Sequence, residues 1–470
     1  MVIGSKMWGF GVFLILGLLV GILQPFGPEL STQGHYIIMM LLVTIGLWIF
    51  KPGNIPFSIS SALFMASLLA LGVAPAGVFA GFTSPAVWSL IPALFFGFVL
   101  AKTGLGKRIA YLGMKSTKLS YGGILFMWAV IGLVLSALTP SIAVRVVIVT
   151  PIALNCVNIC QLPEGSKGRS LILITAWAMA VIPGTGWLSG SLAGPIISGF
   201  YSSVPTLGPI DFSDWSKVQL LPAMLISTLT VIGGYFVLRP SEPLQMTKEA
   251  FSEEYKKLGS FTKEEIITGI VLAAAFLMFV TNSRLHHISD AATCLVAWFL
   301  LAAAGIIKAN EVSIGISWDL VIFVGTAMGF GAVFAQSGVA QWLASIVVPA
   351  LAPISGNPWI FVYSVLVILF IWRFVDIAAL IPTMAIISAI TPQIAEAYGI
   401  NPLVWIGLLC IPLNAFFMSY TNMFALVGEA NMMGKGWTAK HFAQVGIVYF
   451  ISSMISMIVT IPYWISIGMF

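Results

Sequence analysis

The chain has 470 residues, of which 59% are hydrophobic and 8% are charged, and its formal net charge is +5. Soluble domains average about 25% charged residues, so the composition excludes a sizeable soluble domain and predicts an all-α polytopic membrane protein embedded in a lipid bilayer. The basic excess is expected in cytoplasmic loops, as the positive-inside rule requires, and it does not indicate nucleic-acid binding.

Apolar segments recur along the whole chain. A spanning helix needs about 20 mainly apolar residues. Eleven candidate transmembrane segments meet this requirement: 7–26, 35–51, 57–74, 84–114, 170–202, 217–238, 266–281, 290–307, 318–350, 402–431 and 443–469. The first segment lacks a small-residue cleavage site, so we interpret it as a retained helix rather than as a signal peptide.

Two further apolar runs, 122–161 and 358–397, are about twice as long as a spanning helix, and each is interrupted near its middle. A Thr-Pro-Ser break at 139–141 precedes Arg145 in the first run, and charges at 373–376 interrupt the second. A charge deep in hydrocarbon costs about 2.5–3.5 kcal/mol and usually marks a substrate or ion path. We predict that each run forms a re-entrant hairpin of two half-length helices with its tip buried or facing water.

The distribution of basic residues predicts the orientation in the membrane. With eleven crossings, every Lys and Arg falls on one side except Lys217 and Arg284, which fall on the other side, and Arg145 and Arg373, which belong to the hairpins. The basic side is cytoplasmic, which puts the N-terminus inside and the C-terminus outside the cytoplasmic membrane of a prokaryote. The charged stretch 239–265 is predicted to be an amphipathic cytoplasmic connector.

The two halves of the chain on either side of this connector repeat one another. Residues 97–110 align with 331–344, with identical residues at five of the fourteen positions. An odd number of crossings separates the copies, so they are expected to have opposite orientations. Inverted repeats with broken helices are typical of secondary transporters, in which the site lies at the midplane between the repeats. The predicted repeats are 1–238, which includes the N-terminal helices, and 266–470.

Each predicted hairpin is followed by a helix break rich in glycine and polar residues, at 182–191 and 412–422. Half-helix N-termini can bind an anion, and released carbonyls with hydroxyl and Asn side chains can coordinate Na⁺. Packing of small residues is the alternative, but two breaks in equivalent places favour a site. The candidate substrate-binding residues are Thr139, Ser141, Arg145, Thr185, Asp376, Thr421 and Asn422. The candidate ion-binding or helix-break residues are Ser141, Gly184, Gly186, Asp376, Asn414 and Ser419.

The charged residues of the hairpins allow more than one role. Arg145 offers a planar fork suited to a carboxylate, and it can instead form a structural ion pair with Asp376. Asp376 can pair with Arg145 or Arg373, bind Na⁺, or carry a proton. Arg373 can contact the substrate or snorkel to the outer water boundary.

Other chemistry-bearing residues do not assemble into known motifs. We interpret the cysteines as small packing residues: Cys156, Cys160, Cys294 and Cys410. His286 and His287 lack metal-ligand spacing to other candidates, and the sequence contains neither a phosphate-binding glycine loop with a lysine nor a nucleophile–base motif. We therefore expect no enzyme activity, no ATP drive and no cofactor, with Na⁺ as a possible coupling ion.

These features resemble the divalent anion/sodium symporter (DASS) family of the ion transporter superfamily. Residues 88–110 look like the fourth spanning segment of that family, and 318–323 with Ser337-Gly338 look like its counterpart in the second half. The resemblance implies inverted repeats with two re-entrant hairpins, a homodimer, and an elevator mechanism. It also implies transport of di- or tricarboxylates or sulfate, by Na⁺ symport or by anion exchange.

The hairpin tips match this family only in part. Thr139-Pro140-Ser141 with Arg145 resembles the Thr-Pro-Ser-Asn-Thr-Ala-Arg form of the citrate and oxoglutarate/malate translocator branch, but residues 142–143 are Ile-Ala instead of Asn-Thr. The second tip is also less polar than in that branch. A less polar organic anion, still a carboxylate, suits such a site. An anion-selective channel and a substrate-sensing membrane protein of the same fold remain the alternative hypotheses.

Overall fold

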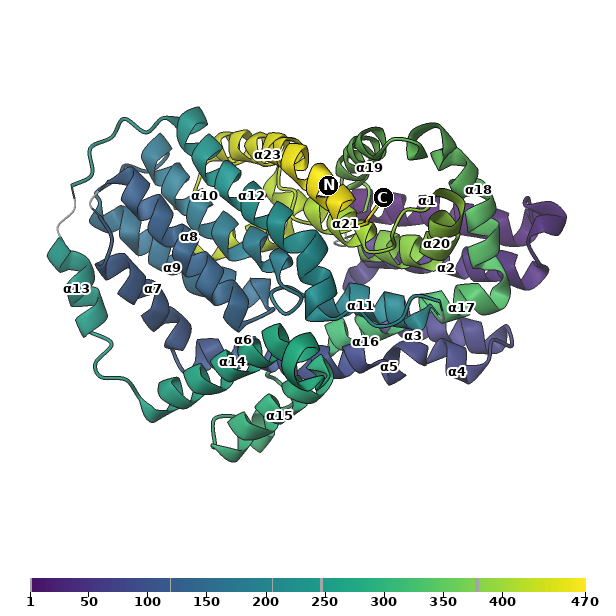
Figure 1. Cartoon of the computed structure of the whole chain (residues 1–470), viewed down its shortest axis with the longest axis horizontal. Coiled ribbons are helices and arrows are strands. Elements are labelled where there is room, and N and C mark those ends of the chain that lie inside the picture. The colour runs from purple at the N-terminus through teal and green to yellow at the C-terminus, as the bar shows by residue number, and fades with distance from the viewer. Residues whose placement is uncertain (1, 119, 205, 246–247, 377–379) are drawn as a thin grey trace.

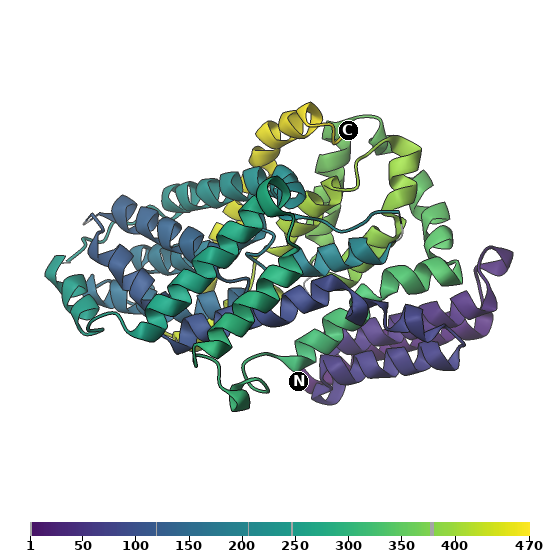
Figure 2. The ribbon, with the colours of Figure 1, turned by 60° about the horizontal axis from the view of Figure 1, so that its bottom comes forward.

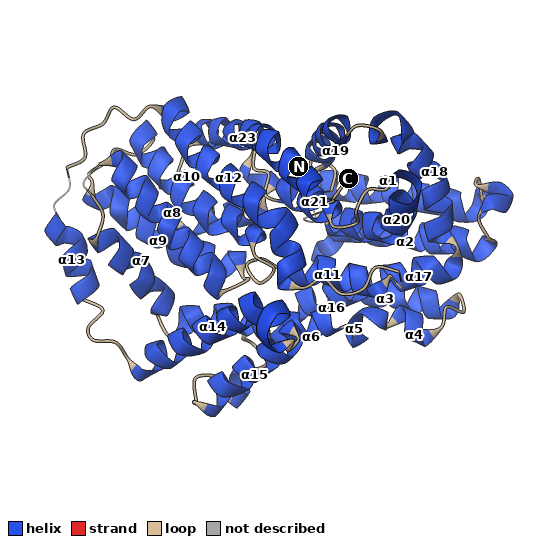
Figure 3. Ribbon diagram, viewed as in Figure 1, coloured by secondary structure: helices blue, strands red, loops and turns tan. Residues whose placement is uncertain are grey.

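The computed structural model describes residues 2–118, 120–204, 206–245, 248–376 and 380–470, and within these ranges the regular elements are all helices (Figure 3). The first half of the chain forms α1 (Val2–Leu23), α2 (Thr32–Phe50), α3 (Phe57–Ala70), α4 (Pro75–Val78), α5 (Ala80–Thr83), α6 (Pro85–Lys102), α7 (Leu105–Lys115), α8 (Tyr121–Leu138), α9 (Ile142–Ile159), α10 (Lys167–Val181), α11 (Ala193–Ser203) and α12 (Phe212–Leu238).

The second half of the chain continues with α13 (Lys248–Lys256), α14 (Lys263–Thr281), α15 (Asp290–Ala303), α16 (Trp318–Met328), α17 (Phe330–Ser337), α18 (Val339–Ser355), α19 (Pro358–Trp372), α20 (Ile381–Tyr398), α21 (Val404–Leu413), α22 (Met423–Asn431) and α23 (Ala439–Ser466). Nine helical stretches of the described residues are long and apolar enough to cross a bilayer, and shorter apolar helices accompany them. The prediction of an all-α polytopic membrane protein is confirmed.

The molecule is elongated, and its helices gather toward two ends (Figures 1 and 2). One end holds α7 to α10 with α12 and α13, and the other holds α1 to α5 with α16 to α18 (Figure 1). Helix α6 packs against α15 and α11, whereas α3 packs against α2 and α16. The N-terminal helices therefore contact the second half of the chain.

Two predicted spans are divided in the structure. The run 84–114 separates into α6 and α7 at Gly104, which has a φ of +80°, and the run 318–350 divides at Gly329 and at Gly338, which has a φ of +76°. A positive φ is accessible to glycine without the Cβ clash that other residues suffer. Gly104 and Gly338 occupy matching positions of the aligned segments, so the repeats share a backbone feature as well as a sequence pattern.

The first hairpin consists of α8 and α9, which are 18 residues each. At 1.5 Å per residue each arm is about 27 Å long, so the run 122–161 divides at its Thr-Pro-Ser interruption into two helices of about half its length. Helix α10 packs against both arms, and every side chain from 168 to 181 is buried. A helix that is apolar on most faces can be surrounded in this way, and α10 therefore forms the centre of this end of the molecule.

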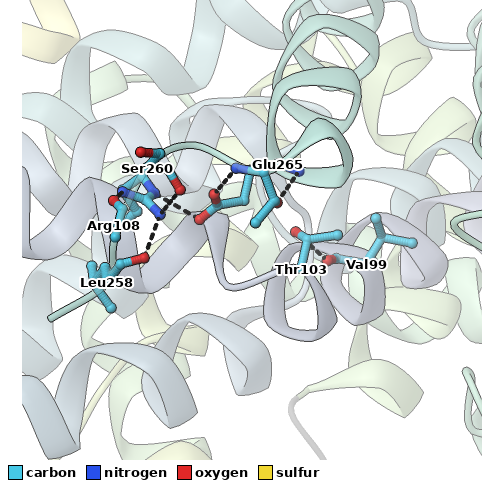
Figure 4. A network of polar contacts seen from close by, with 8 residues as sticks. Val99, Thr103, Arg108, Leu258, Ser260 and Glu265 are labelled. Atoms are coloured by element: carbon cyan, nitrogen blue, oxygen red, sulfur yellow. Dashed lines mark hydrogen bonds and ion pairs between the residues drawn. The ribbon is translucent and has the colours of Figure 1, made fainter.

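A buried ion pair ties α7 to the segment that enters α14 (Figure 4). Arg108 Nε donates to Glu265 Oε1 at 2.7 Å, and the Arg108 guanidinium also donates to the carbonyls of residues 258–260. The two side chains are only 3% and 5% exposed. The hydrogen bond to Glu265 outweighs the effect of burial and raises the pKa of Arg108 above its ordinary value. The contact fixes the connector against α7.

Candidate functional site

The tip of the first hairpin is a short extended segment between α8 and α9. Thr139 has φ −153° and ψ 134°, and Ser141 caps α9 by accepting a hydrogen bond from the Val144 backbone at 3.4 Å. The Ser141 backbone N–H donates to Thr139 Oγ1 at 3.2 Å. Pro140 has no N–H to lose, so the chain can turn here at depth without leaving an extra donor unpaired.

Arg145 lies one turn inside α9 and is completely buried. Its Nε donates to the Ala180 carbonyl at 2.7 Å, and its Nη1 donates to the Gly190 carbonyl at 2.7 Å and to the Thr139 carbonyl. A Cβ at Gly184 would lie 2.2 Å from Arg145 Nη2, so only glycine fits beside the guanidinium. Arg145 therefore joins the hairpin tip to both sides of the first helix break.

The first helix break contains a 3-10 turn, Ile182–Gly186, between α10 and α11. Thr185 Oγ1 donates to the Ile182 carbonyl at 2.9 Å and accepts a hydrogen bond from Asn414 Nδ2 at 3.1 Å. The Trp215 indole donates to the Thr185 carbonyl at 2.9 Å. Because Asn414 ends α21, the Thr185–Asn414 contact joins the helix breaks of the two halves.

The second helix break lies between α21 and α22. Asn422 caps α22 by accepting a hydrogen bond from the Phe424 backbone at 3.0 Å, and its Nδ2 donates to the Ala415 carbonyl at 3.4 Å. Thr421 Oγ1 donates to the Met418 carbonyl at 2.7 Å. Both Asn422 and Thr421 are buried, so the predicted polar residues hold the break in shape from within.

Glu429 is a further residue of this site, and it is not among the candidate residues selected from the sequence. Its Oε1 accepts hydrogen bonds from the Ser419 hydroxyl and, at 3.0 Å, from the Trp437 indole. The carboxylate thus links the second break to the loop before α23. Ser419 lies in the 3-10 turn of the break and Glu429 lies in α22, so the contact joins two different elements and no single periodic pattern signalled it.

Asp376 has a local role at the tip of the second hairpin. Its Oδ2 accepts hydrogen bonds from Thr383 Oγ1 at 2.6 Å and from the Thr383 backbone at 3.3 Å, so it caps the first turn of α20. Arg373 Nη1 donates to the Asp376 carbonyl at 2.8 Å. Both Arg373 and Asp376 are buried, which excludes snorkelling of Arg373 to a water boundary in this state. Part of the tip, 377–379, lies outside the described residues.

The two hairpin charges are not structurally equivalent. Arg145 is the fourth residue of α9, whereas Asp376 precedes α20, which begins at Ile381. Arg145 donates to carbonyls of the first half, and Asp376 Oδ2 accepts from a residue of its own hairpin. The two charges therefore occupy different positions relative to the helices that follow the two tips.

The structure brings the predicted residues together in a chain of contacts. The first tip is held to the first break by Arg145, and the first break is held to the second break by Thr185 and Asn414. The second tip reaches the second break through stacking of Phe374 on Phe417, with ring centroids 5.5 Å apart. Among the described residues no cluster of three or more His, Cys, Asp or Glu side chains could hold a metal ion.

Helical hairpins and broken helices in both halves define a polytopic membrane protein of the secondary-transporter class. Residues 5–470 match the family model described as sodium:sulfate symporter transmembrane region, and the chain belongs to this family of membrane transporters. The resemblance to the DASS family is thereby confirmed, and so is the expectation that the protein is not an enzyme.

Relatives and a solved structure agree with this assignment. The chain is 24% identical over 404 residues to the chloroplastic dicarboxylate transporter 1 of Spinacia oleracea, which covers 83% of this chain and 69% of that protein. It is 22% identical to the putative malate transporter YflS of Bacillus subtilis, over 75% of this chain and 74% of that protein. The crystal structure of the Alcanivorax borkumensis YdaH transporter shares the fold, with a TM-score of 0.57, 14% identity and coverage of 99% and 98%.

Proposed function

We propose that the protein is a secondary active transporter of a small organic anion, a di- or other carboxylate, in the cytoplasmic membrane of a prokaryote. The observation that carries this proposal is the Thr185–Asn414 contact, which joins two helix breaks beside the hairpin tip that Arg145 holds. Broken helices that meet in this way are the usual binding elements of secondary transporters. The names of the relatives add dicarboxylate and malate as the first substrates to test.

The carboxylate would be bound by backbone N–H groups and hydroxyls rather than by an arginine. The first turn of α9, at Ile142 and Ala143, and the first turn of α22 present N–H groups at the positive ends of half-helices. Thr139 and Ser141 add hydroxyls beside the first of these turns. Since Arg145 faces carbonyls, we assign it a positioning role and revise the expectation of direct substrate contact.

The apolar side chains of the first tip limit the kind of anion that would bind there. Ile142 and Ala143 offer no side-chain donor or acceptor, and Phe374 stacks on Phe417 at the second tip. An anion with fewer polar groups than citrate fits such walls better, because each polar substrate group without a partner would lose its hydration.

Coupling would use the same helix breaks. Carbonyls released at the ends of α10 and α21, with the Ser419 and Asn414 side chains, are the kind of oxygen ligands that Na⁺ accepts in transporters. Alternatively, Asp376 or Glu429 would carry a proton. We further propose a homodimer in which the unit of α8 to α10, α12, α22 and α23 moves like an elevator against α1 to α5 and α16 to α18, with the N-terminus inside and the C-terminus outside.

Transport by purified protein in liposomes tests the proposal. Labelled malate, oxoglutarate and less polar carboxylates are offered with a Na⁺ gradient, a pH gradient or internal anion for exchange. Uptake should saturate, and Thr185→Val with Asn414→Leu should reduce its maximal rate at least tenfold, whereas Thr281→Val, outside the site, should not. Channel-like currents in planar bilayers would overturn the carrier proposal, and ligand binding without any flux would assign a sensor instead.

A further inference from the structure

A cavity of about 240 Å³ lies between the first hairpin tip and the turn that joins α14 to α15. Leu138 and Pro140 line it from the hairpin, and Ser189 lines it from the first helix break. The opposite wall comes from α6, α14 and α15. None of the second hairpin tip or the second helix break belongs to the described residues that line it, so the cavity is not the space between the two helix breaks.

The walls of this cavity are aromatic and apolar over most of their extent. Phe276 and Phe279 of α14 and Phe212 of α12 line it, and Phe212 and Phe276 meet edge to face with centroids 6.0 Å apart. Trp187, in the first break, contacts both rings, with centroid separations of 6.4 Å to Phe212 and 5.6 Å to Phe276. Its indole N–H donates a hydrogen bond to Ser136 Oγ at 3.1 Å. An aromatic wall of this kind accepts an apolar body and also attracts a cation to the ring faces.

One end of the cavity is acidic. Asp211 and Asp290 both line the cavity and lie close enough together for their charges to repel. Asp211 Oδ1 accepts a hydrogen bond from the Asp214 backbone at 2.7 Å, and Asp290 Oδ1 accepts one from Asn282 Nδ2 at 3.1 Å. The described lining residues include no Lys or Arg, and His287 is the one side chain among them that can carry a positive charge. Two carboxylates at the end of an apolar chamber disfavour an anion and favour a cation.

We propose that this cavity binds a small organic monocation, with its ammonium group at Asp211 and Asp290 and its apolar body against Phe276 and Phe279. The volume is below the ~300–1,000 Å³ of pockets that enclose drug-sized ligands, so the occupant has one ring or a short chain. The walls of the cavity come from the first hairpin and the first helix break on one side and from α14 and α15 on the other. An occupant therefore holds these two parts together and slows any movement between them.

Equilibrium binding to the full chain in lipid nanodiscs tests this assignment, with empty nanodiscs subtracted. The probe is tritiated 4-phenylbutylamine, and the competitors are its neutral analogue 4-phenylbutanol and its anionic analogue 4-phenylbutyrate. The amine should bind saturably and at least tenfold more tightly than the alcohol, and the carboxylate should compete least. Equal competition by the alcohol would overturn the role of the acidic end, and stronger competition by the carboxylate would assign the cavity to the anion path.

A charge-removing variant locates the ammonium group. Asp290→Asn keeps an oxygen that can accept from Asn282, so its fold should persist, and it should weaken amine binding about tenfold while leaving alcohol binding unchanged. Asp214→Asn is the matched control, because Asp214 pairs with Lys217 and does not line the cavity. Unchanged amine affinity in Asp290→Asn, or an equal loss in Asp214→Asn, would overturn the proposal, and so would absence of saturable amine binding to the unaltered protein.

Discussion

Replacement of Arg145 separates a positioning role from a substrate contact. Arg145→Ala removes the donors to the carbonyls of Thr139, Ala180 and Gly190. Each buried acceptor left without a partner costs about 1–3 kcal/mol, which amounts to about 3–9 kcal/mol for three. Removal of the buried charge also relieves a desolvation cost of several kcal/mol, which offsets part of this loss. We therefore expect a net loss of about 2–5 kcal/mol in the free energy of unfolding, together with loss of transport.

The lysine variant sharpens this test. Arg145→Lys keeps the charge, but a lysine ammonium is a point charge that cannot span three carbonyls as the guanidinium fork does. If Arg145 positions the tip, the lysine variant should unfold at a lower temperature than the unaltered protein and lose maximal rate with little change in KM. Thermal unfolding in detergent and uptake kinetics in liposomes measure the two effects. Wild-type thermal stability in Arg145→Ala, or a raised KM alone in Arg145→Lys, would refute the reasoning.

The remaining predictions concern the parts that hold the site in place. Arg108→Ala should destabilise the protein by about 3–5 kcal/mol because it leaves buried Glu265 unpaired. In thermal unfolding, the double variant Arg108→Ala, Glu265→Ala should lose less stability than the two single variants lose together. Additive losses would contradict this pairing. Gly104→Ala lies at φ +80°, and the added Cβ would meet Glu265 Oε1 only at an ordinary contact distance of 4.0 Å. The substitution should therefore cost about 1–2 kcal/mol through backbone strain, and a neutral effect would contradict the strain argument. Burial alone would raise the pKa of Glu242, but backbone hydrogen bonds hold it below the ordinary value. Its stabilisation is therefore present above the unfolded pKa of about 4.3 and is lost as pH falls through the folded pKa, and in Glu242→Gln this part of the acid sensitivity should disappear from unfolding measured against pH.

The positions of the hairpins and breaks could be predicted because their signals are local. A Thr-Pro-Ser interruption at 139–141 marks the first tip, and the Pro and Gly residues of 182–191 mark the first break. A chain in hydrocarbon must satisfy its backbone internally, so a long apolar run with such residues has few alternatives to a break. The division at Gly338 was missed because the run 318–350 carries a single charge and was interpreted as one span, whereas the basic residues on either side of Gly104 in fact mark the end of α6.

The partners of the buried charges could not be predicted, because they are carbonyls from distant parts of the chain. Arg145 reaches carbonyls 35 and 45 positions further on, and Arg169 reaches the carbonyl of Lys435, 266 positions away. Every residue has a backbone carbonyl, so the sequence does not indicate which carbonyls accept hydrogen bonds from a buried arginine. The different positions of Arg145 and Asp376 could not be predicted for a related reason, since a charge within an apolar run does not determine where each helix begins.

The use of these arginines bears on how the proposed site would recognise an anion. Arg108, Arg145 and Arg169 are all buried and all donate to backbone carbonyls, so each holds a bend of the chain in place. A helix N-terminus stabilises a nearby anion by only about 0.3–2 kcal/mol. Under the proposed function, the arginine keeps the N–H groups in position and the substrate meets only dipoles and hydroxyls. Such binding is weak enough for release on the far side, which a carrier requires as much as it requires capture.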